Sequence, residues 1–259
     1  MKRGYIDTPE GEVHYRTEGS GDSVILLHKA GLSSDEFTEM LPYIGKKYKA
    51  VGIDTLGYGN TNLPAKEPDL NAYVENILHF MDGMKIKKAS FVGHLLGASF
   101  AVETAVRHPE RVNKLILWDL IYLDQEERKR TLEEYSHEHV EYKADGSHLV
   151  DVWKSRGPKP GVNLALVQRS AVEYLKSGLG ATAGVSHRAL FAYDIEPQLP
   201  KIKNPTLLLY SKGGAMYARK EAALKQIPAC QTSDIENAGP FPFWEKPEIF
   251  SKAITDYLG

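Results

Sequence analysis

Two stretches of the chain place chemically distinctive residues directly after runs that predict strands. The stretch VILLHKAG puts Lys29 after one such run, and FVGHLLGASF puts Leu95 and Leu96 after another. Burial in apolar surroundings disfavours the charged ammonium form of a lysine. A lysine that is neutral near pH 7 can attack a carbonyl carbon and form a Schiff base. The first stretch thus offers an amine, and the second offers only hydrocarbon.

The elements that would position these residues alternate between strand and helix. Short apolar runs predict strands, after an N-terminal pair within residues 4–19, at 23–28, 49–54, 88–94, 112–119, 204–211 and 232–239. Helical patterns occur at 37–48, 71–84, 97–108 and 248–258. This alternation is typical of an α/β protein whose mostly parallel sheet carries helices on both faces.

The stretch 123–199 interrupts this alternation. It contains a charged helical pattern, a break rich in glycine and proline (KSRGPKPG), and two further helical patterns. We therefore predict a core made of residues 1–122 and 200–259. Residues 123–199 would form a helical cap inserted over the carboxyl edge of the sheet.

With these elements in place, the chain resembles the α/β-hydrolase superfamily, in particular its cap-bearing branch that acts on small molecules. The resemblance spans nearly the whole chain and is carried by VILLHKAGLSSDEF, VGIDTLGYGNTN, FVGHLLGASFAVETAVRHPERVNKLIL, NPTLLLYSKGGAMY and NAGPFPFWEKPEIF. It implies a doubly wound eight-stranded sheet, a pocket between sheet and cap, and a Ser-Asp-His triad in that chain order.

The positions where the resemblance places the triad carry residues that cannot perform its chemistry. Leu95 occupies the nucleophile position, Gly214 the acid position and Pro240 the base position. Some members of the superfamily carry the acid after the preceding core strand, where this chain has Asp119, but here it would have no base to orient. We therefore do not expect serine hydrolysis through these positions.

The resemblance also gathers the altered positions around one pocket. The residues expected at its oxyanion turn and apolar wall are His28, Ala30, His94, Leu96 and Phe241. Lys29 stands where the superfamily usually has glycine, so it is our candidate amine nucleophile, and Lys212 in YSKGG is the second candidate. The alternative for both is an ordinary lysine that points to solvent or pairs with a carboxylate.

Three functions stay open at this point. The first is Schiff-base chemistry, such as retro-aldol cleavage of a hydrophobic carbonyl compound. The second is a catalytically inactive protein that binds an apolar small molecule, and the third is weak residual esterase activity. Replacement of all three triad positions is also what an engineer would introduce, so an engineered variant and a natural non-hydrolytic homologue are both open.

The composition limits the remaining classes of function. The 259 residues include 32 basic and 34 acidic side chains in no long block of one sign, so we expect no binding to nucleic acid or to a membrane surface. Cys230 is the single cysteine, and the N-terminus lacks the apolar core of a signal peptide, so we expect a cytoplasmic protein.

No nucleotide-binding motif or metal-ligand spacing occurs, so we expect neither a cofactor nor a metal. The expected partner is a small hydrophobic molecule, and the oligomeric state is open.

Overall fold

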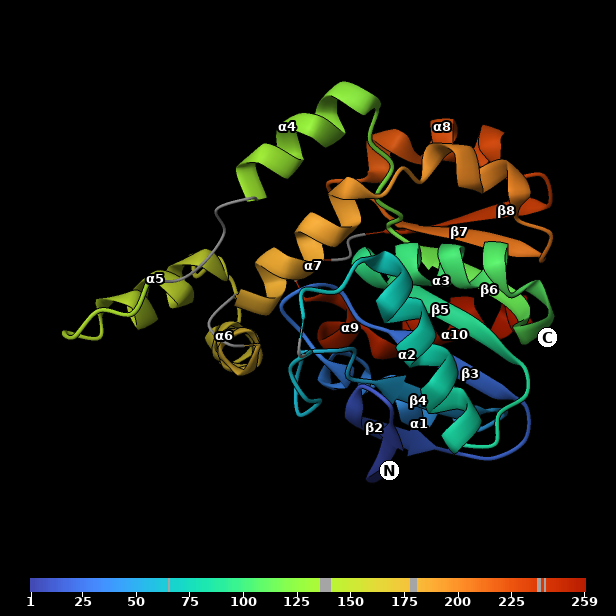
Figure 1. The fold of residues 1–259 in the computed structure, drawn as a ribbon, viewed down its shortest axis with the longest axis horizontal. Helices are drawn as coiled ribbons and strands as arrows, with labels where there is room; N and C mark the ends of the chain where they lie inside the picture. The colour runs from blue at the N-terminus through green and yellow to red at the C-terminus, as the bar shows by residue number, and fades with distance from the viewer. Residues whose placement is uncertain (65, 136–140, 178–180, 237–238, 240) are drawn as a thin grey trace.

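Figure 1 shows the computed structural model of the chain, which describes residues 1–64, 66–135, 141–177, 181–236, 239 and 241–259. Within this part of the chain one eight-stranded sheet has the order β1-β2-β4-β3-β5-β6-β7-β8. The strands are β1 (Lys2–Thr8), β2 (Gly11–Glu18), β3 (Ser23–Leu27), β4 (Lys49–Ile53), β5 (Ala89–His94), β6 (Val112–Trp118), β7 (Thr206–Ser211) and β8 (Cys230–Ile235).

The pairing of the strands confirms the predicted fold class. β1 pairs antiparallel with β2, and β2 pairs antiparallel with β4, whereas the remaining neighbours pair in parallel. The central strand β5 is buried at every position, which explains its continuous run of apolar and small residues. The last strand was predicted at 232–239, but it runs from Cys230 to Ile235.

Helices cover both faces of the sheet and enclose a separate apolar cluster on each (Figure 1). On one face lie α2 (Leu70–Gly83), α3 (Leu96–Arg107) and α8 (Lys220–Gln226). On the other lie α1 (Leu41–Ile44), α9 (Pro242–Glu245) and α10 (Pro247–Leu258). No helix in the described ranges is both long and apolar enough to cross a lipid bilayer.

The helix predicted at 37–48 is much shorter than expected. The segment contains a 3-10 turn at Ser34–Phe37 and then the four-residue α1. Pro42 lacks a backbone N–H, so it cannot donate the hydrogen bond that would continue the helix toward the N-terminus. It ends at Gly45, where a Cβ atom would lie 2.8 Å from the Leu41 carbonyl oxygen.

Four helices lie between β6 and β7, all within the range predicted for the cap. They are α4 (Gln125–Tyr135), α5 (Ser147–Ser155), α6 (Leu164–Lys176) and α7 (Ala181–Ala192), and Figure 1 shows them together to one side of the sheet. Arg169 of α6 joins them to the core, because its guanidinium contacts Asp35 at 2.5 Å and Glu39 at 2.7 Å. The division of the chain at residues 122 and 199 stays a prediction.

Candidate functional site

The turn from β5 to α3 holds Leu95 in a left-handed backbone conformation, with φ 49° and ψ −107°. Such a conformation costs a non-glycine residue about 1–3 kcal/mol. A Cβ atom on Gly93 would lie 2.3 Å from the Gly97 carbonyl oxygen, and one on Gly97 would lie 2.1 Å from the Leu27 carbonyl oxygen. The two glycines are therefore required by close backbone packing, whatever side chain stands at position 95.

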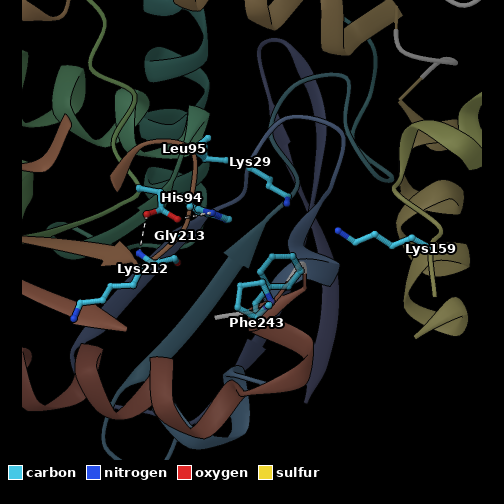
Figure 2. A pocket seen from close by; sticks show the side chains of 13 residues that line it. Lys29, His94, Leu95, Lys159, Lys212, Gly213 and Phe243 are labelled. Carbon is cyan, nitrogen blue, oxygen red and sulfur yellow. Dashed lines mark hydrogen bonds and ion pairs between the residues drawn. The ribbon is translucent and has the colours of Figure 1, made fainter. Parts of the chain in front are cut away.

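The turn after β3 directs the side chain of Lys29 into a cavity (Figure 2). Its Nζ lies 5.1 Å from the ring centre of Phe243. Burial lowers the pKa of Lys29, and the positive charge of Arg156 lowers it further. The negative charges of Glu36 and Asp119 act in the opposite direction. The net direction is downward, as expected for an amine placed for nucleophilic attack.

The cavity has a volume of about 510 Å³ and lies where β5, β6 and β7 end. Strand ends, the loop between α5 and α6, and the segment that enters α9 all contribute to its wall. The lining residues that bear on the chemistry are Lys29, Leu95, Asp119, Lys159, Gly214 and Phe243. The cavity thus brings together Lys29 and Leu95, the residue at the position where the resemblance predicted the nucleophile.

A buried acid–base network lies under the cavity, and its centre, Glu36, was missed in the sequence. Glu36 is fully buried; its Oε1 accepts a hydrogen bond from His94 Nδ1 at 2.5 Å, and its Oε2 accepts one from the Lys29 backbone N–H at 3.0 Å. Burial alone would raise the pKa of Glu36, but His94 and Lys29 hold that pKa below its usual value. The sequence signal was weak, since SSDEF reads as an ordinary charged turn.

Asp119 places a second carboxylate at the cavity wall. Its Oδ1 accepts a hydrogen bond from the Ser211 backbone N–H at 2.9 Å, and its Oδ2 lies 4.0 Å from His94 Nε2. Burial raises the pKa of Asp119, although its neighbours, with His94 first, act against this shift. A carboxyl group with a raised pKa beside a lysine can exchange protons with an intermediate bound there.

The other residues predicted at the oxyanion turn fall into two groups. His28 is fully buried and has both ring nitrogens engaged, since Nδ1 donates to the Lys29 carbonyl oxygen at 2.8 Å and Nε2 accepts from the Thr55 N–H at 3.1 Å. Burial lowers the pKa of His28. Ala30 and Leu96 line a second cavity of about 310 Å³, which also contacts Lys29.

At the apolar wall, Phe243 faces the larger cavity in place of the predicted Phe241. Phe241 is buried against Trp244, with 5.6 Å between the two ring centres. A residue two positions further along the chain therefore has the expected role. The short helix α9 begins at Pro242 and turns the intervening backbone.

The remaining predicted positions lie at the rim of the cavity or outside the described residues. Lys212 pairs with Glu236, which raises the pKa of Lys212, and its side chain points away from the cavity in Figure 2. Gly214 lies beside Asp119, since a Cβ atom on this glycine would be 3.5 Å from Asp119 Oδ2. Pro240 lies outside the described residues.

Residues 22–247 match the family model described as the alpha/beta hydrolase fold. The chain belongs to this family. The match includes the β5–α3 turn and the segment around Phe243, so both walls of the larger cavity lie within it.

Similar proteins of this family include named hydrolases and esterases. The chain is 24% identical, over 98% of its length and 90% of the relative's, to the 2-hydroxy-6-oxo-6-(2'-aminophenyl)hexa-2,4-dienoic acid hydrolase of Metapseudomonas resinovorans. It is 31% identical to strigolactone esterase RMS3 of Pisum sativum over 39% of this chain and 40% of that protein.

Solved structures agree with the sequence comparisons on the fold. The enol-lactonase from Burkholderia xenovorans LB400 superposes with a TM-score of 0.78 at 22% identity, over 98% of this chain and 99% of that one. At this identity the likeness shows the fold and leaves the reaction to be argued from the site.

Proposed function

We propose that this protein uses Lys29 as an amine nucleophile on a hydrophobic carbonyl compound, with retro-aldol cleavage as the reaction. The observation that carries the proposal is the position of Lys29, whose side chain reaches into the cavity beside Leu95 while burial lowers its pKa. In the described part of the chain, no carboxylate lies within ion-pair distance of its Nζ. Leu95, at the former nucleophile position, offers the substrate only hydrocarbon.

The reaction follows from the chemistry of a neutral amine. The Nζ lone pair attacks the ketone carbon of a β-hydroxyketone, and loss of water gives an iminium ion. A base removes the hydroxyl proton, the bond between the α and β carbons breaks, and its electron pair moves to the iminium nitrogen. An aldehyde leaves, the resulting enamine takes up a proton at carbon, and water hydrolyses the second iminium to release a ketone and the free amine.

Two groups in the cavity have roles that fit these steps. Asp119, with its raised pKa, can donate a proton to the departing water and later accept the hydroxyl proton. Phe243 lies beneath Nζ and limits its contact with water. The Metapseudomonas relative is named for an oxo compound, which supports a carbonyl substrate for this fold.

Reductive trapping tests this proposal. The protein is incubated with a naphthyl β-hydroxyketone, treated with borohydride and digested, and the adduct is located by mass spectrometry. We expect one stoichiometric adduct on Lys29, and a loss of turnover of at least about 100-fold in Lys29→Met. Lys212→Met is the matched control, because Lys212 lies at the rim of the same cavity with its ammonium paired with Glu236 and directed away. Labelling scattered over surface lysines, or turnover unchanged in Lys29→Met, would overturn the proposal.

A second candidate function is ligand binding without turnover. The charges of Glu36 and Asp119, and the contact with the Phe243 ring, all favour the ammonium form of Lys29. If these effects prevail at neutral pH, the cavity binds its ligand without forming a covalent bond. Saturable binding with no borohydride-dependent adduct at any pH up to the unfolding limit would identify this case.

A further inference from the structure

Helix α6 presents two charged side chains, Arg169 and Glu173, to the 3-10 turn at Ser34–Phe37. They are four positions apart, which places them on the same face of the helix. Glu173 is 3% exposed and accepts a hydrogen bond from the hydroxyl of Ser33, the residue that caps the turn. Arg169 contacts Asp35 within the turn. Helix α6 therefore holds the turn at two neighbouring points.

The guanidinium of Arg169 donates hydrogen bonds from three nitrogens. Nε and Nη1 donate to the carboxylates of Asp35 and Glu39, and Nη2 donates to the Asp35 carbonyl oxygen at 3.3 Å. The guanidinium carbon lies 4.4 Å from the ring centre of Trp244, whose Nε1 donates to the same Asp35 carbonyl oxygen at 3.1 Å. Arginine can combine a planar fork of donors with stacking on an aromatic ring, whereas lysine cannot. Arg169, Asp35 and Trp244 thus form one connected contact.

The 3-10 turn connects this contact to the backbone of Lys29. Asp35 and Glu36 are consecutive, but their side chains leave the turn in different directions. Asp35 binds Arg169 of α6, whereas Glu36 is buried in the core and accepts the Lys29 N–H at 3.0 Å. The Glu36 N–H donates to the Ser33 carbonyl oxygen at 3.0 Å and closes the turn. A displacement of Asp35 therefore displaces Glu36 as well.

The Trp244 ring connects the same contact to the ammonium end of Lys29. Trp244 lies edge-on to the adjacent Phe243, with 5.0 Å between the ring centres and 78° between the ring planes. Phe243 is the ring that lies 5.1 Å from Lys29 Nζ. Arg169 therefore acts on two supports of Lys29, which are the backbone bond to Glu36 and the ring beside the ammonium.

We infer that Arg169 is a positioning residue for Lys29, and that it acts through Asp35 and Trp244 from outside the cavities. Arg169 is not among the described residues that line either cavity, so its effect reaches a bound molecule through Lys29. The consequence for the reaction rests on the proposed function, whereas the placement of Lys29 rests on the contacts alone.

Loss of the guanidinium would leave the charges around the turn unbalanced. Asp35 Oδ1 also lies 3.4 Å from Nη2 of Arg16 on β2. Without Arg169 this second pair draws the Asp35 carboxylate toward β2 and away from α6, and the Trp244 ring loses the cation stacked on it. Glu39 follows the turn in the chain, so removal of the Glu39 charge alone leaves the bonds to Asp35 and the stacking on Trp244 in place.

Amide NMR spectroscopy of the intact protein tests the placement of Lys29 without any reaction. The variant is Arg169→Gln, and the matched control is Arg188→Gln, because Arg188 joins α7 to Glu67, in the segment between β4 and α2, by a similar ion pair. We expect the Lys29 amide and Trp244 indole N–H resonances to shift in Arg169→Gln and to keep their parent positions in Arg188→Gln. Arg169→Lys keeps the charge without the planar fork and should give intermediate shifts.

Borohydride trapping tests the consequence for the amine. With saturating β-hydroxyketone, Arg169→Gln should form the Lys29 adduct about tenfold more slowly than the parent, because the amine is displaced from its attacking position. The ketone concentration that gives half the maximal rate should change by less than about twofold, since the cavity lining is intact. Arg188→Gln should form the adduct at the parent rate.

The outcomes separate this inference from the proposed function. An unshifted Lys29 amide in folded Arg169→Gln, or equal shifts in Arg169→Gln and Arg188→Gln, would refute the positioning role. A shifted amide together with a parent protein that forms no adduct would support the positioning role and refute only the amine chemistry. If Arg169→Gln does not fold, Trp244→Phe replaces it, since this variant keeps a ring for stacking but removes the N–H bonded to Asp35 and should also shift the Lys29 amide.

Discussion

The turns after β3 and β5 lie side by side in the sheet and line the same two cavities, yet they are held in different ways. Backbone atoms fix the turn at Leu95, whose N–H donates to the Trp118 carbonyl oxygen at 2.9 Å between two tightly packed glycines. A side chain fixes the turn at Lys29, because the buried carboxylate of Glu36 accepts its backbone N–H. The geometry at Leu95 is thus independent of its side-chain chemistry, whereas the geometry at Lys29 depends on one ionised group.

The largest expected effect is a loss of stability from a substitution in the turn that backbone atoms hold. Gly97→Ala should destabilise the protein by about 3–4 kcal/mol, because the new methyl group would overlap the Leu27 carbonyl oxygen. Urea unfolding followed by circular dichroism measures this change. Ser99→Ala on the same helix is the control and should change stability by less than about 0.5 kcal/mol, since Ser99 Oγ is buried without a hydrogen-bond partner among the described residues. A Gly97→Ala variant as stable as the parent would contradict the steric argument.

The turn held by a side chain should respond to loss of charge. Glu36→Gln should destabilise the protein by about 2–4 kcal/mol at pH 7, because it leaves His94 without its buried anion. The pKa of Glu36 is lowered in the folded state, so its contribution to stability is present above pH 4.5, the ordinary pKa of a glutamate, and is lost as the pH falls through the folded pKa. Unfolding at a series of pH values should therefore show the two proteins converge in acid.

The Glu36→Gln substitution also tests the proposed amine chemistry of Lys29. Removing the Glu36 charge should lower the pKa of Lys29 further, so borohydride trapping at neutral pH should become faster. Glu39→Gln is the matched control, because Glu39 is a partly exposed carboxylate paired with Arg169 and should change stability by no more than about 1 kcal/mol. Slower trapping in Glu36→Gln with the fold intact would argue against a titrating amine at Lys29.

A smaller effect of opposite sign is expected for Asp119→Asn. Burial raises the pKa of Asp119 in the folded state. Its contribution to stability is therefore present below pH 3.8, the ordinary pKa of an aspartate, and is lost as the pH rises through the folded pKa. The variant keeps an oxygen that can accept the Ser211 N–H, and its stability relative to the parent should rise from acid to neutral pH. Thermal unfolding across this range is the measurement, and a difference that does not vary with pH would rule out the assigned shift.

The smallest expected effect is on hydrolysis. Leu95→Ser introduces a hydroxyl into the turn after β5, but the ring of His94 is directed at carboxylates on both sides, with Nδ1 bonded to Glu36 and Nε2 4.0 Å from Asp119 Oδ2. We expect ester turnover to stay at the background rate and a serine-directed fluorophosphonate to leave no label. Stoichiometric labelling of position 95 would show that the network under the cavity can activate a serine after all.

The fold was predictable because its signals are local. The strands from β3 to β7 each contain a short apolar run, and their alternation with helical patterns indicates the parallel sheet. The error at α1 is also local, since Pro42 and Gly45 shorten a segment whose apolar spacing suggested a longer helix. The predicted meeting of Lys29 and Leu95 depended on the resemblance to the α/β-hydrolase superfamily, which places both turns at one pocket.

The site was less predictable because its interactions join distant residues. Glu36 and His94 are 58 positions apart, and no spacing rule relates them. Lys159 reaches the cavity from the loop between α5 and α6, whose placement depends on contacts such as that of Arg169 with Asp35. Phe243 replaces Phe241 at the cavity wall because a short helix begins between them. These placements require the tertiary structure.

The conformation of Leu95 also bears on how activation barriers are explained in related enzymes. A strained turn around a catalytic serine is naturally counted as energy stored for the reaction. Here the same left-handed backbone surrounds a hydrocarbon that can react with nothing. The strain is thus a property of connecting β5 to α3 beside β3, and rate enhancement in such enzymes has to be sought in groups that change between the ground state and the transition state.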